Sequence, residues 1–163
     1  MSAAAPEIAP VVGKLLPPKR LPLCVDFYKG GHHAFLNPKL QHVYHYLESR
    51  GGEFDNVVCA GASFVAKVLS EYTLTREHID EAEELFAHSH TNLDLQLDRQ
   101  RWEALISKHE GKLPLKILAL PDGTTVPIHT PMLVVHNTDP EFAWLPGYVE
   151  SWLLSVVYLR FSE

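Results

Sequence analysis

The sequence predicts an α+β fold, with a mixed, mainly antiparallel sheet packed with helices. Segments with strand-type alternation and segments with helical spacing occur in blocks, without the regular alternation of strand and helix that a parallel sheet requires. The chain has 163 residues, of which 46% are hydrophobic. That length and composition suit one domain with a core and are too small for two.

Four segments predict strands. Residues 42–48 (HVYHYLE) alternate, with Val43, His45 and Leu47 on one face. Residues 113–120 (LPLKILAL) form a second apolar-faced strand, followed by a Pro-Asp-Gly turn and a return strand over 124–126. Residues 132–135 predict another strand.

Helical spacing predicts three helices in the middle of the chain. The first covers residues 61–72, and the second opens at Thr75, which is suited to cap it. The third is capped by Asp98 and stopped by Gly111. The acidic residues of the second helix are most simply a solvated face.

A further helix begins at the run Asn-Thr-Asp-Pro-Glu, residues 137–141. Thr138 and Glu141 have capping-box spacing, while Asp139 before Pro140 is an alternative cap. We expect a kink or break at Pro146-Gly147. Because the rest of this helix is apolar on several sides, either the N-terminal half of the chain or another chain should cover it, and we expect Trp152 and its neighbours to promote self-association.

Charge and cysteine content exclude several classes of protein. The 14 basic and 20 acidic residues give a net charge of -6, which argues against a nucleic-acid binder. The two cysteines, Cys24 and Cys59, lie in apolar settings without CxxC spacing, so buried free thiols in a reducing cytosol are favoured over a disulfide. No apolar run is long enough to span a membrane and no secretory signal is recognisable, so we expect a cytoplasmic protein.

The segment from Asp26 to Gly52 gathers polar and aromatic side chains of the kinds found in binding sites. Its sequence is DFYKGGHHAFLNPKLQHVYHYLESRGG, with a Gly30-Gly31 break followed by paired histidines. An apolar lead into a polar, glycine-broken turn is a common way of presenting ligand-binding residues, and the alternative is an ordinary surface turn. Arg50, at the end of the predicted strand, can reach a ligand or merely solvent.

The histidines do not predict a metal site. His78, His88, His90 and His109 lie on or beside the predicted helices without a carboxylate or cysteine at ligand spacing. His88 and His90 face different ways on a helix. We therefore expect no metal site.

Four motifs occur in order along the chain: DFYKGGHH, VYHYLESRGGEFDNVV, EGKLPLKILALPDGTTVP and HNTDPEFAWLPGYVESWLLS. Together they resemble the N-terminal domain of the nicotinamide phosphoribosyltransferase family, one of the type II phosphoribosyltransferases. The resemblance implies three parts, namely a mobile leader rich in proline and alanine over residues 1–22, the family domain over 23–158, and a divergent tail over 159–163. Family members continue into a phosphoribosyltransferase barrel, so this chain is expected to be a detached piece.

The resemblance implies a role in NAD salvage. The family makes nicotinamide mononucleotide and pyrophosphate from nicotinamide and 5-phosphoribosyl 1-pyrophosphate, and full-length members use ATP and Mg. Its head-to-tail dimers build each site at the subunit interface. By resemblance, Tyr28 stacks on the nicotinamide ring from the neighbouring subunit, Arg50 approaches the phosphates, and Asp26 and Lys29 support them. The catalytic residues belong to the barrel, so none is assigned here, and no cofactor is expected in this chain.

Three functional hypotheses follow. The chain is half of a glycosyltransferase that needs a barrel to be active, or a non-catalytic interaction module that docks on a full-length homologue, or a truncated remnant. In each, the partner is a second copy or a barrel-containing homologue. Neither nucleic acid nor a membrane is expected as a partner.

Overall fold

The computed structural model of the 163-residue chain describes residues 18–88 and 97–161, with side chains for 20–88 and 97–154. Its main sheet has three antiparallel strands in the order β1-β5-β3, formed by Tyr44–Leu47, Leu133–Asn137 and Leu115–Ala119. A two-stranded antiparallel sheet pairs β2 (Asn56–Val58) with β4 (Thr125–Pro127). Together with the helices, these sheets confirm the α+β class.

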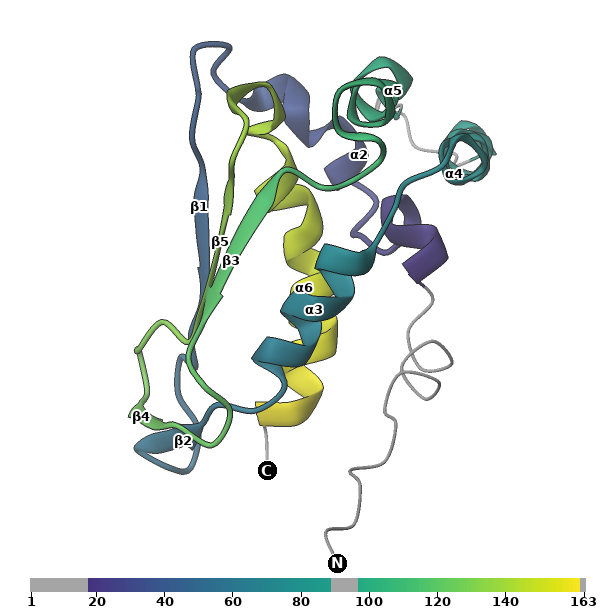
Figure 1. The fold of residues 1–163 in the computed structure, drawn as a ribbon. Coiled ribbons are helices and arrows are strands. Elements are labelled where there is room, and N and C mark those ends of the chain that lie inside the picture. Colours follow the sequence, from purple (N-terminus) through teal and green to yellow (C-terminus); the bar gives the residue numbers. More distant parts are fainter. Residues whose placement is uncertain (1–17, 89–96, 162–163) are drawn as a thin grey trace, which may run out of the picture.

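The helices of the described part lie on one side of the main sheet (Figure 1). They are η1 (Pro18–Leu23), α2 (Lys29–His32), η2 (His33–Phe35), α3 (Ala62–Glu71), α4 (Arg76–His88), α5 (Arg99–His109), η3 (Pro140–Phe142) and α6 (Leu145–Phe161). α3 and α6 pack on the sheet and on each other, whereas α4 and α5 pack together further from it. The opposite face of the sheet therefore carries no helix within the described residues.

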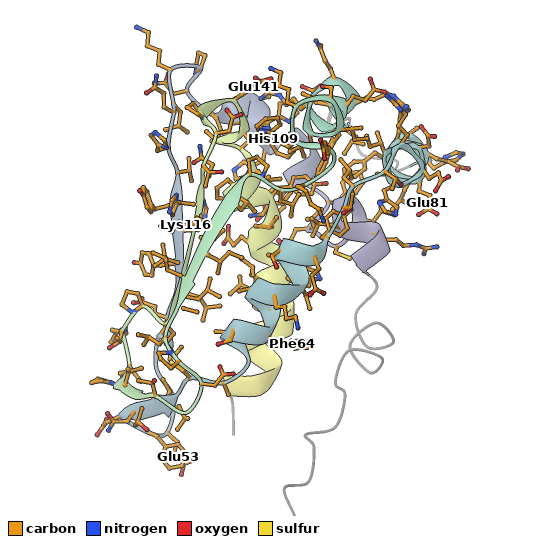
Figure 2. All side chains as sticks on the ribbon, viewed as in Figure 1. Glu53, Phe64, Glu81, His109, Lys116 and Glu141 are labelled. Atoms are coloured by element: carbon orange, nitrogen blue, oxygen red, sulfur yellow. The ribbon has the colours of Figure 1, made fainter. Side chains whose placement is uncertain are left out.

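The predicted strand faces are confirmed. In β1, His45 and Leu47 are half-buried while Tyr44 and Tyr46 are exposed. In β3, Leu115 and Ile117 are likewise half-buried, and Lys116 lies on the open face of the sheet (Figure 2). The amphipathic alternation arises because helices cover only one face.

The return strand after the Pro-Asp-Gly turn forms as predicted, but its partner is β2, which the sequence analysis did not predict. Backbone hydrogen bonds join Cys59 N–H to the Thr124 carbonyl (2.8 Å) and Gly123 N–H to the Cys59 carbonyl (2.7 Å). Meanwhile β5 occupies the sheet position beside β3. β4 therefore lies outside the main sheet and pairs with β2.

The three central helices begin and end close to the predicted residues. Asp98 caps α5, because its carboxylate accepts a hydrogen bond from the Arg101 N–H (3.3 Å). Gly111, with a φ of +78°, follows the last turn, and a Cβ there would lie 2.3 Å from the Leu74 carbonyl oxygen. Only glycine fits this stop without displacing the backbone.

The expected break at Pro146-Gly147 is wrong. Both residues lie in the first turn of α6, which begins at Leu145. Proline is tolerated there because its missing N–H would have no partner within the helix. The Asp-Pro cap starts the separate short helix η3, where the Asp139 carboxylate accepts from the Glu141 N–H (2.9 Å).

α6 is the centre of the core, where α3 and β1 of the N-terminal half and β5 of the C-terminal half pack against it. Val149 is fully buried, and Tyr148, Trp152 and Leu153 are each no more than 5% exposed. Trp102 of α5 contacts Tyr148 edge to face, with ring centroids 4.8 Å apart. Trp152 itself is therefore buried, which corrects the expectation that it lies on the surface, whereas self-association through its neighbours stays a prediction.

Residues 1–17 lie outside the described residues, so the predicted mobile leader stays a prediction. Its last residues belong to η1, where Leu21 is 2% exposed and the Pro22 carbonyl accepts a hydrogen bond from the Tyr148 hydroxyl (2.6 Å). Cys24 and Cys59 are free thiols, as predicted, with Cys59 buried and Cys24 half-buried. In the part of the chain that is described, no helix combines the length and the apolar character that crossing a membrane requires.

Candidate functional site

The candidate site begins with a helical turn, where the sequence analysis expected a glycine break. The N–H groups of Lys29, Gly30 and Gly31 each donate to the carbonyl three residues earlier, at 2.9 to 3.3 Å. Gly30 is needed for packing, because a Cβ there would lie 2.2 Å from the Phe86 ring of α4. That ring also stacks on Phe27, with centroids 4.7 Å apart.

Two side chains of this turn attach it to α6. Ser151 donates its hydroxyl hydrogen to the Asp26 carboxylate, at 2.7 Å. The Lys29 ammonium donates to the Gly147 carbonyl at 2.8 Å and to Glu150 Oε2 at 2.9 Å. Lys29 is only 4% exposed, so this ion pair is shielded from water on the lysine side.

His45 of β1 joins the same carboxylate. Its Nδ1 lies 3.3 Å from Glu150 Oε2, a contact that needs a proton on Nδ1. Burial lowers the pKa of His45 below its usual value, Glu150 opposes this shift, and the nearby Lys29 and His32 add to it. Burial disfavours the charged ring more than one carboxylate, already paired with a lysine, favours it.

Tyr28 points away from this clamped turn. Its side chain is 52% exposed, and the described residues supply no hydrogen-bond partner for its hydroxyl. The ring has an edge contact with His32, with centroids 5.7 Å apart, and the Lys29 ammonium lies 5.6 Å from its centroid. About half of the Tyr28 surface is thus left open to a ligand or a partner.

Arg50 lies three residues beyond the end of β1, exposed as predicted, and none of the described residues forms a hydrogen bond or ion pair with its guanidinium. The backbone before it is held by the His129 N–H, which donates to the Ser49 carbonyl (2.8 Å). Arg50 borders a hollow of about 180 Å³ with an apolar floor. Its lining residues are His45, Tyr46, Leu47, Glu48, Arg50, Leu133, Val135, Glu150, Leu153 and Leu154.

The structure connects the predicted site residues through Glu150. This carboxylate borders the hollow that contains Arg50 and also accepts the hydrogen bond from Lys29, next to Tyr28. His45 lines this hollow and a smaller one of about 50 Å³ beside Lys29. Asp26 and Lys29 act on the α6 side, while Tyr28 and Arg50 are directed outward.

Glu150 is a member of the site that the sequence pattern did not predict. One signal could have indicated it, because Glu150 is the only acidic residue between Phe142 and Phe161. A carboxylate in so apolar a helix requires a partner. Nothing local in the sequence identifies that partner as a lysine 121 positions earlier.

His109 serves packing and an ion pair. His109 Nε2 lies 2.9 Å from the Asp139 carboxylate, and its ring meets Phe142 edge to face. Glu141 of η3, labelled with His109 in Figure 2, forms an ion pair with Lys108, the residue before His109. Within residues 18–88 and 97–161, no group of three or more His, Cys, Asp or Glu side chains could hold a metal ion; His90 lies outside them.

Comparisons with known proteins point to one family. Residues 20–117 match the family model of the nicotinamide phosphoribosyltransferase N-terminal domain. A nicotinamide phosphoribosyltransferase of Xanthomonas campestris is 32% identical over 137 residues, and one of Acinetobacter baylyi is 31% identical over 144 residues. These matches cover 83% and 79% of this chain but only 28% of each relative.

A solved structure shows the same fold. The crystal structure of human nicotinic acid phosphoribosyltransferase matches with a TM-score of 0.54 and 16% sequence identity. The match covers 81% of this chain and 25% of the human one. At this identity the similarity concerns the fold alone.

Proposed function

Because the chain belongs to the nicotinamide phosphoribosyltransferase family, in which it matches the N-terminal domain, we propose that it supplies one half of a site for NAD salvage. In that site nicotinamide and 5-phosphoribosyl 1-pyrophosphate react to nicotinamide mononucleotide and pyrophosphate. The chain spans 28% of the length of its curated relatives. The catalytic half belongs to a barrel domain, carried either on a longer form of this chain or on another chain.

The observation that carries the proposal is the outward presentation of Tyr28 and Arg50. Tyr28 is 52% exposed, whereas its neighbour Lys29 is 4% exposed. The turn therefore presents the Tyr28 ring to solvent, while the lysine that holds the turn on α6 is buried. A flat pyridine ring gains about 0.5–1.5 kcal/mol from such an aromatic face, beyond the area it buries. Arg50 offers a planar fork of donors that suits a phosphate.

Neither residue breaks or forms a bond in the proposed reaction. Tyr28 would orient the nicotinamide ring, and Arg50 would hold phosphate oxygens while the bond to the ribose forms elsewhere. When bound, ATP and Mg would act on the barrel side. Asp26 and Lys29 would support Tyr28 through α6.

The test is a chimera in which this chain replaces the matched part of the Xanthomonas relative. We expect this chain alone to make no nicotinamide mononucleotide and the chimera to make it, measured by mass spectrometry. Tyr28→Ala should lower the rate at low nicotinamide by about tenfold, whereas Tyr28→Phe, which keeps the ring, should preserve it.

Product from this chain alone would contradict the proposal, as would a chimera that is equally active with Tyr28→Ala. A second format avoids dependence on the fusion. The remainder of the Xanthomonas relative, produced without the matched part, is mixed in one sample with this chain. In a second sample it is mixed with the relative's own matched part. If only the relative's own part restores activity, the proposal is wrong.

A second candidate function is a non-catalytic module that docks on a full-length homologue. The observation in its favour is the open face of the main sheet, where Tyr44, Tyr46 and Leu118 are each more than half exposed. Light scattering of the chain mixed with the Xanthomonas relative distinguishes the two. A complex without product in either format supports the module, and product supports the half-site.

A further inference from the structure

We propose that Glu150 is a positioning residue for Tyr28, because it holds the turn of residues 26–29 on α6 and so fixes the direction in which the Tyr28 ring leaves the surface. The consequence for substrate binding rests on the proposed function. The positioning itself does not, and it can be tested without any substrate.

The hydrogen bonds that hold the turn on α6 lie on both sides of Tyr28 in the sequence, at Asp26 and Lys29. Their acceptor and donor groups on α6 belong to Gly147 and to Glu150 and Ser151, which follow Gly147 by three and four residues. Such residues share one face of a helix. The first turns of α6 thus bind the residues on either side of Tyr28 in the sequence.

The contact between Lys29 and Glu150 is stronger than the other hydrogen bond of Lys29 to α6. The Lys29 ammonium is buried and donates at 2.9 Å to a charged oxygen, whereas its other acceptor is a neutral carbonyl. Hydrogen bonds between charged groups are the stronger ones, and a buried charge without its partner is costly. Glu150 is therefore the main support of Lys29.

The turn is also confined on the side of α4. Gly30 lies directly against the Phe86 ring, and Phe27 stacks on the same ring. α2 is thus packed between α4 and α6, and the only large side chain of the turn that projects outward is Tyr28. Because Tyr28 has few contacts of its own, its direction depends on the backbone that Glu150 holds.

The substrate-free test is hydrogen exchange of the full chain, followed in the peptide that contains residues 26–33. In the native protein the N–H groups of Lys29, Gly30 and Gly31 are hydrogen-bonded within the turn. Glu150→Gln keeps the shape and removes the charge. We expect these amides to exchange at least about tenfold faster, while peptides from β3 and β5 keep their rates.

The matched control is Glu84→Gln, which removes the same charge from an exposed position of α4. It should change neither set of rates. Unchanged exchange in residues 26–33 of Glu150→Gln would overturn the inference, and an equal rise in β3 and β5 would do the same, because it would show general destabilisation.

The chimera separates this inference from the proposed function. There, Glu150→Gln should raise KM for nicotinamide about tenfold and change kcat by less than about threefold, since a misdirected stacking ring weakens ground-state and transition-state binding alike. Faster exchange, together with an inactive chimera and no activity in the unfused format, would leave positioning supported and the proposed function wrong. An active chimera with unchanged KM and exchange would overturn the positioning alone.

Discussion

At the residue scale, Asn137 shows how one polar side chain can join three segments. It is 1% exposed. Its amide oxygen accepts from the Val43 N–H (2.9 Å), and its amide nitrogen donates to the carbonyls of Gln41 (2.7 Å) and Asp139 (2.9 Å). The side chain thus connects β5 to the approach to β1 and to the start of η3. All of its contacts are with backbone groups that have no strand partner there.

Asn137→Ala should therefore lower the free energy of unfolding by about 2–3 kcal/mol, because it leaves these backbone groups without a partner in a buried place. Urea unfolding followed by tryptophan fluorescence measures the change. Asn37→Ala is the matched control, since the Asn37 amide oxygen accepts only from the exposed Lys39 N–H, and it should cost less than about 1 kcal/mol. Equal losses in both variants would contradict the role of Asn137.

His45 makes the stability depend on pH. Burial lowers its pKa in the folded state below the usual 6.5, and burial lowers that of His33 as well. Below the usual pKa the unfolded chain therefore binds more protons than the folded chain. By linkage, the free energy of unfolding is fully retained above about pH 6.5 and decreases as the pH falls below it.

We expect the urea concentration at the unfolding midpoint to decrease when the pH is lowered from 7.5 to 5.5. The decrease should be smaller in His45→Gln, because the glutamine side chain cannot be protonated. The measurement is a series of urea titrations over that range. The two proteins are compared first at pH 7.5, which isolates the packing effect of the substitution. A His45→Gln variant with an undiminished dependence would show that other groups cause it.

At the scale of elements, the contact between α2 and α4 explains why residue 30 is a glycine. A methyl group at Gly30 would lie 2.2 Å from the Phe86 ring, which is held by its stack on Phe27. Gly147 in the first turn of α6 is different, because a Cβ there would lie 3.6 Å from the His45 ring, an ordinary contact distance. The two glycines are therefore unequal in what they tolerate.

Gly30→Ala should lower the free energy of unfolding by about 1–3 kcal/mol through overpacking. Gly147→Ala is the control and should change it by less than about 1 kcal/mol. Thermal or urea unfolding measures both. Recovery of part of the loss in Gly30→Ala by Phe86→Leu would identify the ring as the obstacle, and no recovery would point to a backbone cause.

At the scale of the whole molecule, α6 is the element on which the others depend. It packs on β1, β5 and α3, and its polar residues hold the turn before α2. Tyr148, Val149, Trp152 and Leu153 belong to the main hydrophobic cluster together with residues of η1, α3, α4 and α5. The remaining elements would expose this cluster if α6 were absent.

Deleting residues 143–163 should abolish the cooperative unfolding transition, because the core would lose its central helix. Circular dichroism during heating measures this. Deleting residues 1–17, which the sequence predicts to be part of a mobile leader, is the contrasting truncation and should leave the transition in place. A cooperative transition without α6 would show that the sheet and α3 fold independently.

The sequence alone determined the features that depend on local periodicity and local chemistry. The alternation around His45 predicted β1, and Asp98 and Gly111 predicted the ends of α5, because caps and strand faces are set by neighbours in the chain. The exposure of Arg50 beyond β1 followed from the same reasoning. Local patterns also predicted the α+β class, since they fix which segments are helices and which are strands.

Only the tertiary structure decided which distant residues meet. The pairing of β2 with β4, the burial of Trp152 in the main hydrophobic cluster, and the tight contact of Gly30 with Phe86 all depend on contacts between remote segments. So does the attachment of Lys29 to Glu150. These contacts are set by how the elements pack, and local periodicity carries no information about which remote side chain fills a given space. The turn that presents Tyr28 is thus recognisable in the sequence, while its support on α6 becomes visible only in the fold.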